Sequence, residues 1–141
     1  AKPSLVLMSL WGIGQTALIY LASLQDVPES LYESADLDGA SAFQKVINIT
    51  VPMISPVILF NVIMGLIGTF QYFTQAYIMT AGGPADSTLF YALYLYNNAF
   101  RFFKMGYASA MAWLMFLVIF VMTALTFRAS SRFVYYGGQV R

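Results

Sequence analysis

The chain contains no cysteine and no histidine, and the two absences exclude several classes of function. A chain without cysteine forms neither disulfides nor thiolate metal sites. A chain without histidine lacks the side chain that most often acts as a general base or a metal ligand. Charge is also scarce, at 9% of residues with a net charge of +1, so the sequence carries no basic stripe of the kind that binds nucleic acid.

Hydrophobic residues take the place of the missing charges. They make up 60% of the chain, whereas a typical soluble domain carries about 25% charged residues. Three runs hold no charged residue at all, over 3–25, 46–85 and 105–127. Because a helix needs about 20 apolar residues to cross a bilayer, each run is long enough to span. The composition therefore predicts an all-α integral membrane protein and disfavours the alternative, a very hydrophobic soluble helical bundle.

We expect three membrane-spanning helices within a single domain over residues 1–141, at about 5–24, 52–80 and 107–127. The second would be 29 residues long, so it should tilt, kink or project beyond the hydrocarbon. Segment 84–104 has too few apolar residues to span, and its tyrosines and phenylalanines indicate an external interfacial helix. The chain starts at Ala1 without an initiator Met, so we expect a fragment of a longer membrane protein.

Two of the predicted spans carry a polar face. In the first span, helical spacing places four residues together: Met8, Trp11, Gly12 and Gln15. In the second span, the corresponding face holds Asn61, Gly65, Gly68, Tyr72, Gln75 and Met79. Polar groups inside a span usually face a water-filled path or the bundle, but small residues and amides also serve helix packing. The pattern itself leaves both interpretations open.

Residues 26–51 hold five of the six acidic residues of the chain. Glu29, Glu33 and Asp36 fall on one face of a predicted short helix, beside a narrow apolar stripe of Leu31 and Ala35. Such a short helix is not stable alone in water. The segment therefore has to dock on the parent membrane domain or on another protein, because a solvated acidic loop would not explain its apolar residues.

Capping residues give this segment predicted boundaries. Asp26 is placed to cap the first helix, and Gly39 to end it in a left-handed turn. Ser41 and Gln44 have the spacing of a capping box for a second helix that runs up to Pro52. The sequence thus predicts two short helices joined at Gly39.

The stretch "YESADLDGASAFQKVINITVP" resembles the EAA loop of permease subunits in binding-protein-dependent ABC importers. The family pattern is Glu-Ala-Ala, three residues, Gly, nine residues, Ile-x-Leu-Pro. The matching positions are Glu33, Ala35, Gly39, Ile49 and Pro52, with Ser34 and Val51 as mild departures. "DGA" and "GGP" fit the carbohydrate branch, and "MGYASAMAWLMF" with "RFVYYGG" resembles its maltose-type and glycerol-phosphate-type permeases, the first of the two subunits more than the second.

The resemblance implies a type I ABC importer permease (MetI-like) core, of which this chain would be the C-terminal half. It implies that the 26–51 loop is cytoplasmic and that its first helix is a coupling helix seated on an ATPase subunit. A count of four basic residues on the side of the loop against three on the other side agrees weakly. The implied ATPase-coupling residues are Leu31, Tyr32, Glu33, Ala35, Asp36, Asp38 and Gly39. Among them, Glu33 would pair with a basic residue of the ATPase, and Leu31 and Ala35 would pack in its groove.

The resemblance also implies a substrate path midway through the membrane. The sugar contacts of maltose-type permeases align with Met8, Trp11, Gly12, Gln15, Gly68, Thr69 and Tyr72. These positions overlap the two polar faces, which favours a path over packing alone. The residue types differ from the maltose-type set, so the identity of the sugar does not follow.

The implied partners are a second permease subunit, a dimer of ATP-binding subunits and an extracytoplasmic solute-binding protein that docks near 84–104. A membrane-embedded enzyme is a further alternative, but no carboxylate or histidine lies inside a predicted span to act as acid or base, so we expect no enzyme and no cofactor or metal. The chain has no GxxxxGK[ST] phosphate loop, so we expect ATP hydrolysis on a partner. The expected location is the cytoplasmic (inner) membrane of a bacterium or archaeon, as a multi-pass protein. The alternative function is a non-transporting membrane scaffold, for which Glu33 and Gly39 would be replaceable.

Overall fold

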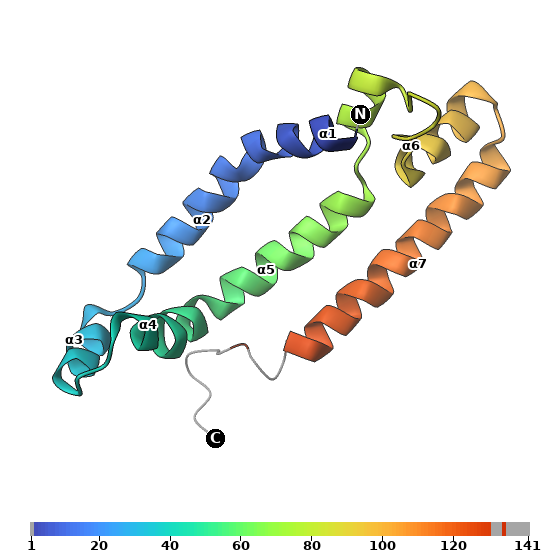
Figure 1. Ribbon diagram of the computed structural model, residues 1–141. Helices are drawn as coiled ribbons and strands as arrows, with labels where there is room; N and C mark the ends of the chain where they lie inside the picture. Colours follow the sequence, from blue (N-terminus) through green and yellow to red (C-terminus); the bar gives the residue numbers. More distant parts are fainter. Residues whose placement is uncertain (1, 131–133, 135–141) are drawn as a thin grey trace. The chain divides into compact units, whose positions relative to one another are not determined.

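The computed structural model describes residues 2–130 and residue 134. Its contacts divide the chain into two compact units, Ala1–Gly12 with Ile63–Leu125 and Ile13–Val62 with Thr126–Arg141. The described residues form helices joined by turns, with no strand among them (Figure 1). The stretch "RFVYYGG" (residues 132–138), which resembles the maltose-type and glycerol-phosphate-type permeases, lies outside the described residues apart from Val134.

Three helical stretches are long and apolar enough to cross a membrane, Lys2–Gln25, Ala42–Phe70 and Met105–Ser130. Only 6% of the residues in the most apolar window of each stretch are buried within the chain. A helix that is hydrophobic on all sides and yet uncovered by its own chain needs lipid or other subunits around it. The prediction of an all-α integral membrane protein with three spans is confirmed.

The first stretch contains a change of helix type. It comprises α1 (Lys2–Ser9), a 3₁₀ turn at Leu10–Gly12 and α2 (Ile13–Gln25). Trp11, in the middle of that turn, is 96% exposed. The border between the two compact units also falls after Gly12, so the change of helix type coincides with a division of the fold.

The second stretch begins earlier and ends earlier than predicted. It comprises α4 (Ala42–Lys45), a π-helical turn at Val46–Thr50 and α5 (Val51–Phe70). The prediction of a single helix up to Thr80 is wrong, because the helix stops at Phe70 and only a short π-helical segment, Ala76–Thr80, follows. The 20 residues of α5 span about 30 Å, which matches the hydrocarbon core. Together with the turn before it, however, the helical stretch Ala42–Phe70 is 29 residues long, so the break shifts the predicted stretch toward the N-terminus without shortening it.

Pro56 lies inside α5 without ending it. A proline has no N–H, so the carbonyl four residues earlier, that of Pro52, loses its helical donor. The Ser55 hydroxyl donates to the Pro52 oxygen over 2.6 Å and satisfies that carbonyl instead. This local substitution lets the span continue past the proline.

Residues 71–104 connect α5 to α7 (Met105–Ser130) through α6 (Tyr91–Tyr96), which continues as a π-helical segment at Asn97–Arg101. Much of the small core of the first unit lies here, with Ala76, Thr88 and Leu93 almost fully buried. The Tyr91 hydroxyl donates to the Met111 oxygen over 2.8 Å, which ties α6 to α7. A short helix in this segment was predicted, and the structure has one; its position at the membrane surface stays a prediction.

Candidate functional site

The first helix of the acidic loop is α3 (Glu29–Leu37), in the second compact unit. Its N-cap residue is Pro28, in an extended conformation, and no side chain caps it. The prediction that Asp26 caps this helix is therefore wrong. Val27, which is 7% exposed, anchors the entry to α3 instead, and the fixed φ of Pro28 sets the direction of the chain there.

The C-terminal end of α3 follows the prediction. Gly39 has φ +75, in the left-handed region that glycine enters without cost. The Ala40 N–H donates to the Ala35 oxygen over 2.9 Å, which closes the last turn. Space is not what selects glycine here, because an added Cβ would meet no atom within 4 Å. The positive φ of the backbone alone favours glycine at this position.

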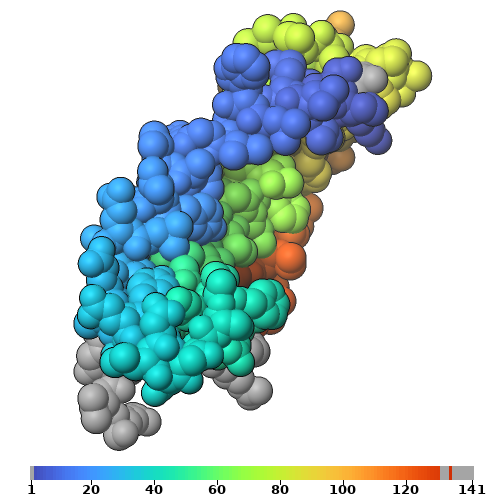
Figure 2. All heavy atoms as spheres, turned by 60° about the vertical axis from the view of Figure 1, so that its left-hand side comes forward, coloured from blue at the N-terminus to red at the C-terminus, as the bar shows by residue number. Residues whose placement is uncertain are grey.

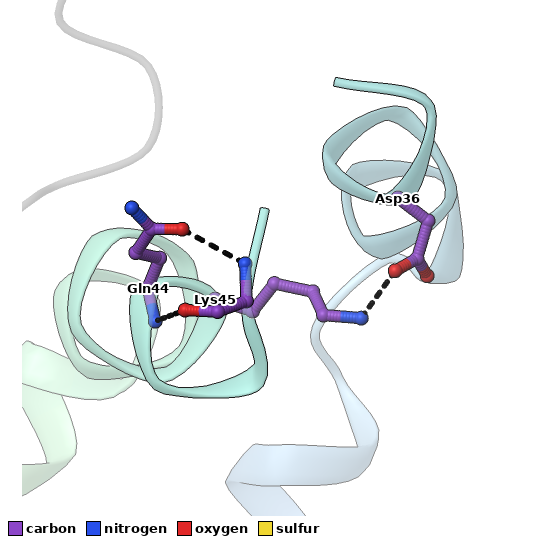
Figure 3. Close-up of polar contacts among 4 residues, drawn as sticks. Asp36, Gln44 and Lys45 are labelled. Carbon is purple, nitrogen blue, oxygen red and sulfur yellow. Dashed lines mark hydrogen bonds and ion pairs between the residues drawn. The ribbon is translucent and has the colours of Figure 1, made fainter. Parts of the chain in front are cut away.

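The predicted capping box is present at the start of α4. The Gln44 side-chain oxygen accepts from the Ser41 N–H over 2.8 Å, and the Ser41 hydroxyl accepts from the Gln44 N–H over 3.4 Å. Figure 3 shows this pair beside a second contact, in which the Lys45 ammonium reaches across to the Asp36 carboxylate on α3. The capping box and the ion pair together hold the reversal of the chain between the two helices.

The three acids of the predicted docking face do not share one environment. Asp36 forms an ion pair with Lys45. Glu29 and Glu33 are exposed, and within the described part of the chain neither forms an ion pair. Of the predicted face, the structure thus leaves Glu29 and Glu33 available to a partner and turns Asp36 toward the chain itself.

Tyr32 also faces the chain itself. Its hydroxyl lies 2.7 Å from the Thr50 hydroxyl, at the end of the π-helical turn. Among the apolar residues predicted to pack in a partner's groove, Ala35 is half-buried and Leu31 is 39% exposed. Asp38, the remaining predicted residue, is exposed as the C-cap of α3.

Sequence reasoning missed Leu37, which is 91% exposed. It follows Glu33 by four residues, so the two lie on one face of α3. That spacing was the available signal, and an exposed leucine beside an unpaired acid is a better docking feature than Leu31. Figure 2 shows α3 and the turn after it (cyan) at the surface of their unit.

The seven predicted path residues are less well assembled. Thr69 and Tyr72 line a hollow of about 430 Å³ in the first unit, together with Lys2, Leu5, Val6, Ser9 and Phe90. Tyr72 packs edge-on against Phe90, with ring centroids 5.4 Å apart. Met8, Trp11, Gly12 and Gly68 are exposed and do not line this hollow, and Gln15 belongs to the other unit. Sequence reasoning missed Lys2, Ser9 and Phe90, for which no periodicity gave a signal.

A second hollow, of about 630 Å³, lies in the segment predicted to meet the solute-binding protein. Its lining residues are Tyr77, Ile78, Ala81, Leu93, Tyr96, Asn97, Phe100 and Arg101. Tyr77, chiefly through a side-chain hydrogen bond, raises the pKa of Tyr96 above its ordinary value. Tyr96 therefore stays neutral near pH 7, and Arg101 supplies the charge of this hollow.

Comparison with known proteins decides the family. A model described as "Binding-protein-dependent transport system inner membrane component" matches residues 2–134. The chain belongs to this family. It is accordingly a multi-pass inner membrane protein of the permease class, in agreement with its three candidate spans.

Relatives in this permease family cover most of the chain. It is 46% identical over 135 residues, 94% of the chain, to the "Probable ABC transporter permease protein YesP" of Bacillus subtilis. It is 39% identical over 134 residues, 92% of the chain, to the "Lactose transport system permease protein LacF" of Rhizobium radiobacter. It is 34% identical over 131 residues, 92% of the chain, to the "Arabinooligosaccharides transport system permease protein AraP" of Bacillus subtilis. The chain spans 44%, 45% and 42% of these relatives, less than half of each.

In the acidic loop, more than in the predicted path, the structure agrees with what the family resemblance implies. The pattern's glycine, Gly39, has the positive φ that the pattern needs, and its Glu33 is exposed on α3. The predicted path, in contrast, is represented only by Thr69 and Tyr72 in a common hollow.

Proposed function

We propose that the chain forms part of the membrane-spanning permease subunit of an ATP-driven importer for a sugar or sugar-like solute. The observation that carries the proposal is the EAA-type loop: a short exposed helix, closed by a glycine with positive φ, on a chain of the binding-protein-dependent permease family. The names of two relatives, which specify lactose and arabinooligosaccharides, support a sugar as the solute.

In this proposal, α3 is the coupling helix and seats on a separate ATP-binding subunit. Glu33 pairs with a basic residue there, and Leu37 fills an apolar groove beside it, because both are exposed on one face of α3. ATP is hydrolysed on that partner. A complete importer also contains a second permease subunit, a second copy of the ATP-binding subunit and an extracytoplasmic solute-binding protein, which docks near the Tyr96–Arg101 hollow.

The sugar path in this proposal uses Thr69 and Tyr72. Their hollow offers hydroxyl groups for hydrogen bonds and the Tyr72 and Phe90 rings as apolar walls. A sugar presents hydroxyls around its rim and C–H groups on its faces, so this mixture of hydroxyls and rings suits it. Met8, Trp11, Gly12, Gln15 and Gly68 join the path only if the complete importer covers their exposed faces.

The test is a transport assay with the full-length permease and its partner subunits in proteoliposomes. We expect ATP-dependent uptake of lactose or an arabinooligosaccharide and co-purification of the ATP-binding subunit with the permease. Glu33→Ala should release that subunit, because removing one partner of a buried charge pair costs about 2–5 kcal/mol. Asp26→Ala, outside α3, is the matched control and should retain the subunit. A Glu33→Ala permease that keeps both the subunit and uptake would contradict the coupling role of Glu33, whereas a wild-type permease without ATP-dependent uptake would support the scaffold alternative.

A further inference from the structure

Two contacts join α3 to the helix that leads into the second span. Tyr32 reaches Thr50 through their hydroxyls, 2.7 Å apart, and Asp36 reaches Lys45 through an ion pair. The two helices run antiparallel at these contacts. Tyr32 precedes Asp36 by four residues on α3, whereas its partner Thr50 follows Lys45 by five residues on the other helix. Together with the turn at Gly39, they fasten α3 at three points along its length.

The π-helical turn Val46–Thr50 makes this double contact possible. In an α-helix, residues four apart share a face, and residues five apart do not. In a π-helix the hydrogen bonds join residues five apart, so such residues lie one above the other. The Val51 N–H donates to the Val46 oxygen in this way. Thr50 therefore lies on the same side of its helix as Lys45, five residues before it, and both face α3.

The ion pair adds little to folding stability. The Asp36 side chain is 61% exposed and that of Lys45 is 22% exposed, and exposed ion pairs contribute little to stability. What two contacts on one face do provide is orientation: a single contact leaves α3 free to pivot, and a second one, a helical turn away, prevents it. π-helical turns within α-helices are frequently found at functional sites for this kind of local geometry.

We propose that Tyr32 and Asp36 are positioning residues, which brace α3 against the Ala42–Phe70 helix so that the two move as one body. This inference rests on the proposed function, in which α3 is the coupling helix. It separates two roles within the loop. Glu33 and Leu37 hold the ATP-binding subunit, whereas Tyr32–Thr50 and Asp36–Lys45 pass the motion of that subunit to the span.

The experiment uses the full-length permease assembled with its partner subunits in lipid nanodiscs. Two quantities are measured: retention of the ATP-binding subunit and stimulation of ATP hydrolysis by the solute-binding protein, with lactose or an arabinooligosaccharide added as a probe and without sugar. We expect Asp36→Lys and Lys45→Asp each to retain the subunit and to lose most of the stimulation. The double variant Asp36→Lys with Lys45→Asp should regain it, because the pair is restored with its charges exchanged.

Tyr32→Phe and Thr50→Val test the second contact with little change in side-chain size, and each should weaken the stimulation without loss of the subunit. Asp26→Lys is the matched charge-reversal control outside α3 and should behave as the wild type. The brace is overturned if the single variants keep full stimulation, or if they release the subunit and the exchanged pair does not restore it. If the wild-type permease retains no ATP-binding subunit, the proposed function itself fails, and the brace with it.

Discussion

Gly39 is a residue whose role is purely conformational. An added methyl group would meet no neighbour, yet the backbone has φ +75. Residues with a Cβ reach the left-handed region only at a cost of about 1–2 kcal/mol, whereas Asn enters it more easily than Ala or Val. The tolerance of this position should therefore follow backbone preference and not side-chain volume.

We predict that Gly39→Ala and Gly39→Val destabilise the turn by about 1–2 kcal/mol and that Gly39→Asn costs less. Hydrogen–deuterium exchange of amides 34–45 in the full-length permease would report the loss as faster exchange. Gly106→Ala is the matched control. A Cβ at position 106 also meets no atom within 4 Å, but this glycine lies in the first turn of a helix. Equal effects of Ala and Asn at position 39 would contradict the conformational explanation.

The three acidic residues of the predicted docking face differ in their contacts, although their spacing in the sequence makes them equivalent. By spacing, Glu29, Glu33 and Asp36 are equivalent members of one face. Lys45 separates Asp36 from the other two. Nothing in helical periodicity predicts that pair, because its partner lies on the next helix, nine residues away across the Gly39 turn.

At the scale of elements, α6 depends on α7 for its place. The link is the hydrogen bond from the Tyr91 hydroxyl to the Met111 oxygen, next to a Met111 side chain that is 6% exposed. A carbonyl in a continuous helix already has a helical donor, so this tyrosine adds a second hydrogen bond without disturbing α7.

We predict that Tyr91→Phe lowers the stability of the full-length permease by about 1 kcal/mol, the usual contribution of one hydrogen bond. The measurement is the thermal unfolding midpoint in detergent. Tyr94→Phe, on the same helix and 38% exposed, should stay within about 0.5 kcal/mol of the wild type. The prediction fails if both substitutions shift the midpoint equally.

For the individual elements, the sequence was sufficient to predict features that depend only on composition or on neighbouring residues. Composition was enough for three spans, and capping patterns were enough for the Gly39 turn and the Ser41–Gln44 box. The end of the second span at Phe70 was not predictable in this way, because residues 71–80 hold no charged residue, proline or glycine that would mark a stop. At the break, Tyr72 and Phe73 instead make aromatic contacts with residues distant in the sequence, Phe90 and Tyr96 respectively.

The residues of the candidate site show the same difference between features set by local spacing and features that depend on other segments. The loop residues Glu33 and Gly39 could be predicted because their spacing is local. The Tyr32–Thr50 contact was missed because a π-helical turn changes which residues share a face, and no sequence pattern marked that turn. The predicted path residues lie on surfaces that other segments have to complete. Periodicity on one helix could therefore suggest these residues, but it could not show which of them come together.

At the scale of the whole molecule, the second candidate span decides sidedness. Within the described residues it separates residues 26–41 from residues 71–104, and a helix that crosses the membrane once has its two ends on opposite sides. The excess of Lys and Arg on the side of the acidic loop is only four against three, a weak basis for orientation. The proposed function requires that loop to be cytoplasmic, where the ATP-binding subunits are.

We predict the sidedness by cysteine labelling of a full-length permease whose other cysteines are replaced first; residues 1–141 contribute none. In intact cells, a membrane-impermeant maleimide should label full-length permease carrying Lys104→Cys and leave Asp26→Cys unlabelled. Permeabilised cells should give labelling at both positions, which controls for reactivity. Labelling of Asp26→Cys in intact cells would invert the orientation and contradict a coupling role for α3.

The π-helical turn between α4 and α5 also constrains how this chain can change in length. Deleting one residue among Val46–Ile49, within this turn, would convert it to a regular α-helix, in which residues four apart share a face. The threonine now at position 50 would then lie four residues after Lys45 and on the same side of the helix, so α5 would keep its phase. A deletion within α5 itself would instead rotate every residue after it by about 100°. Single-residue deletions in the π-helical turn should therefore be tolerated far better than single-residue deletions in α5, because only the latter alter the phase of the span.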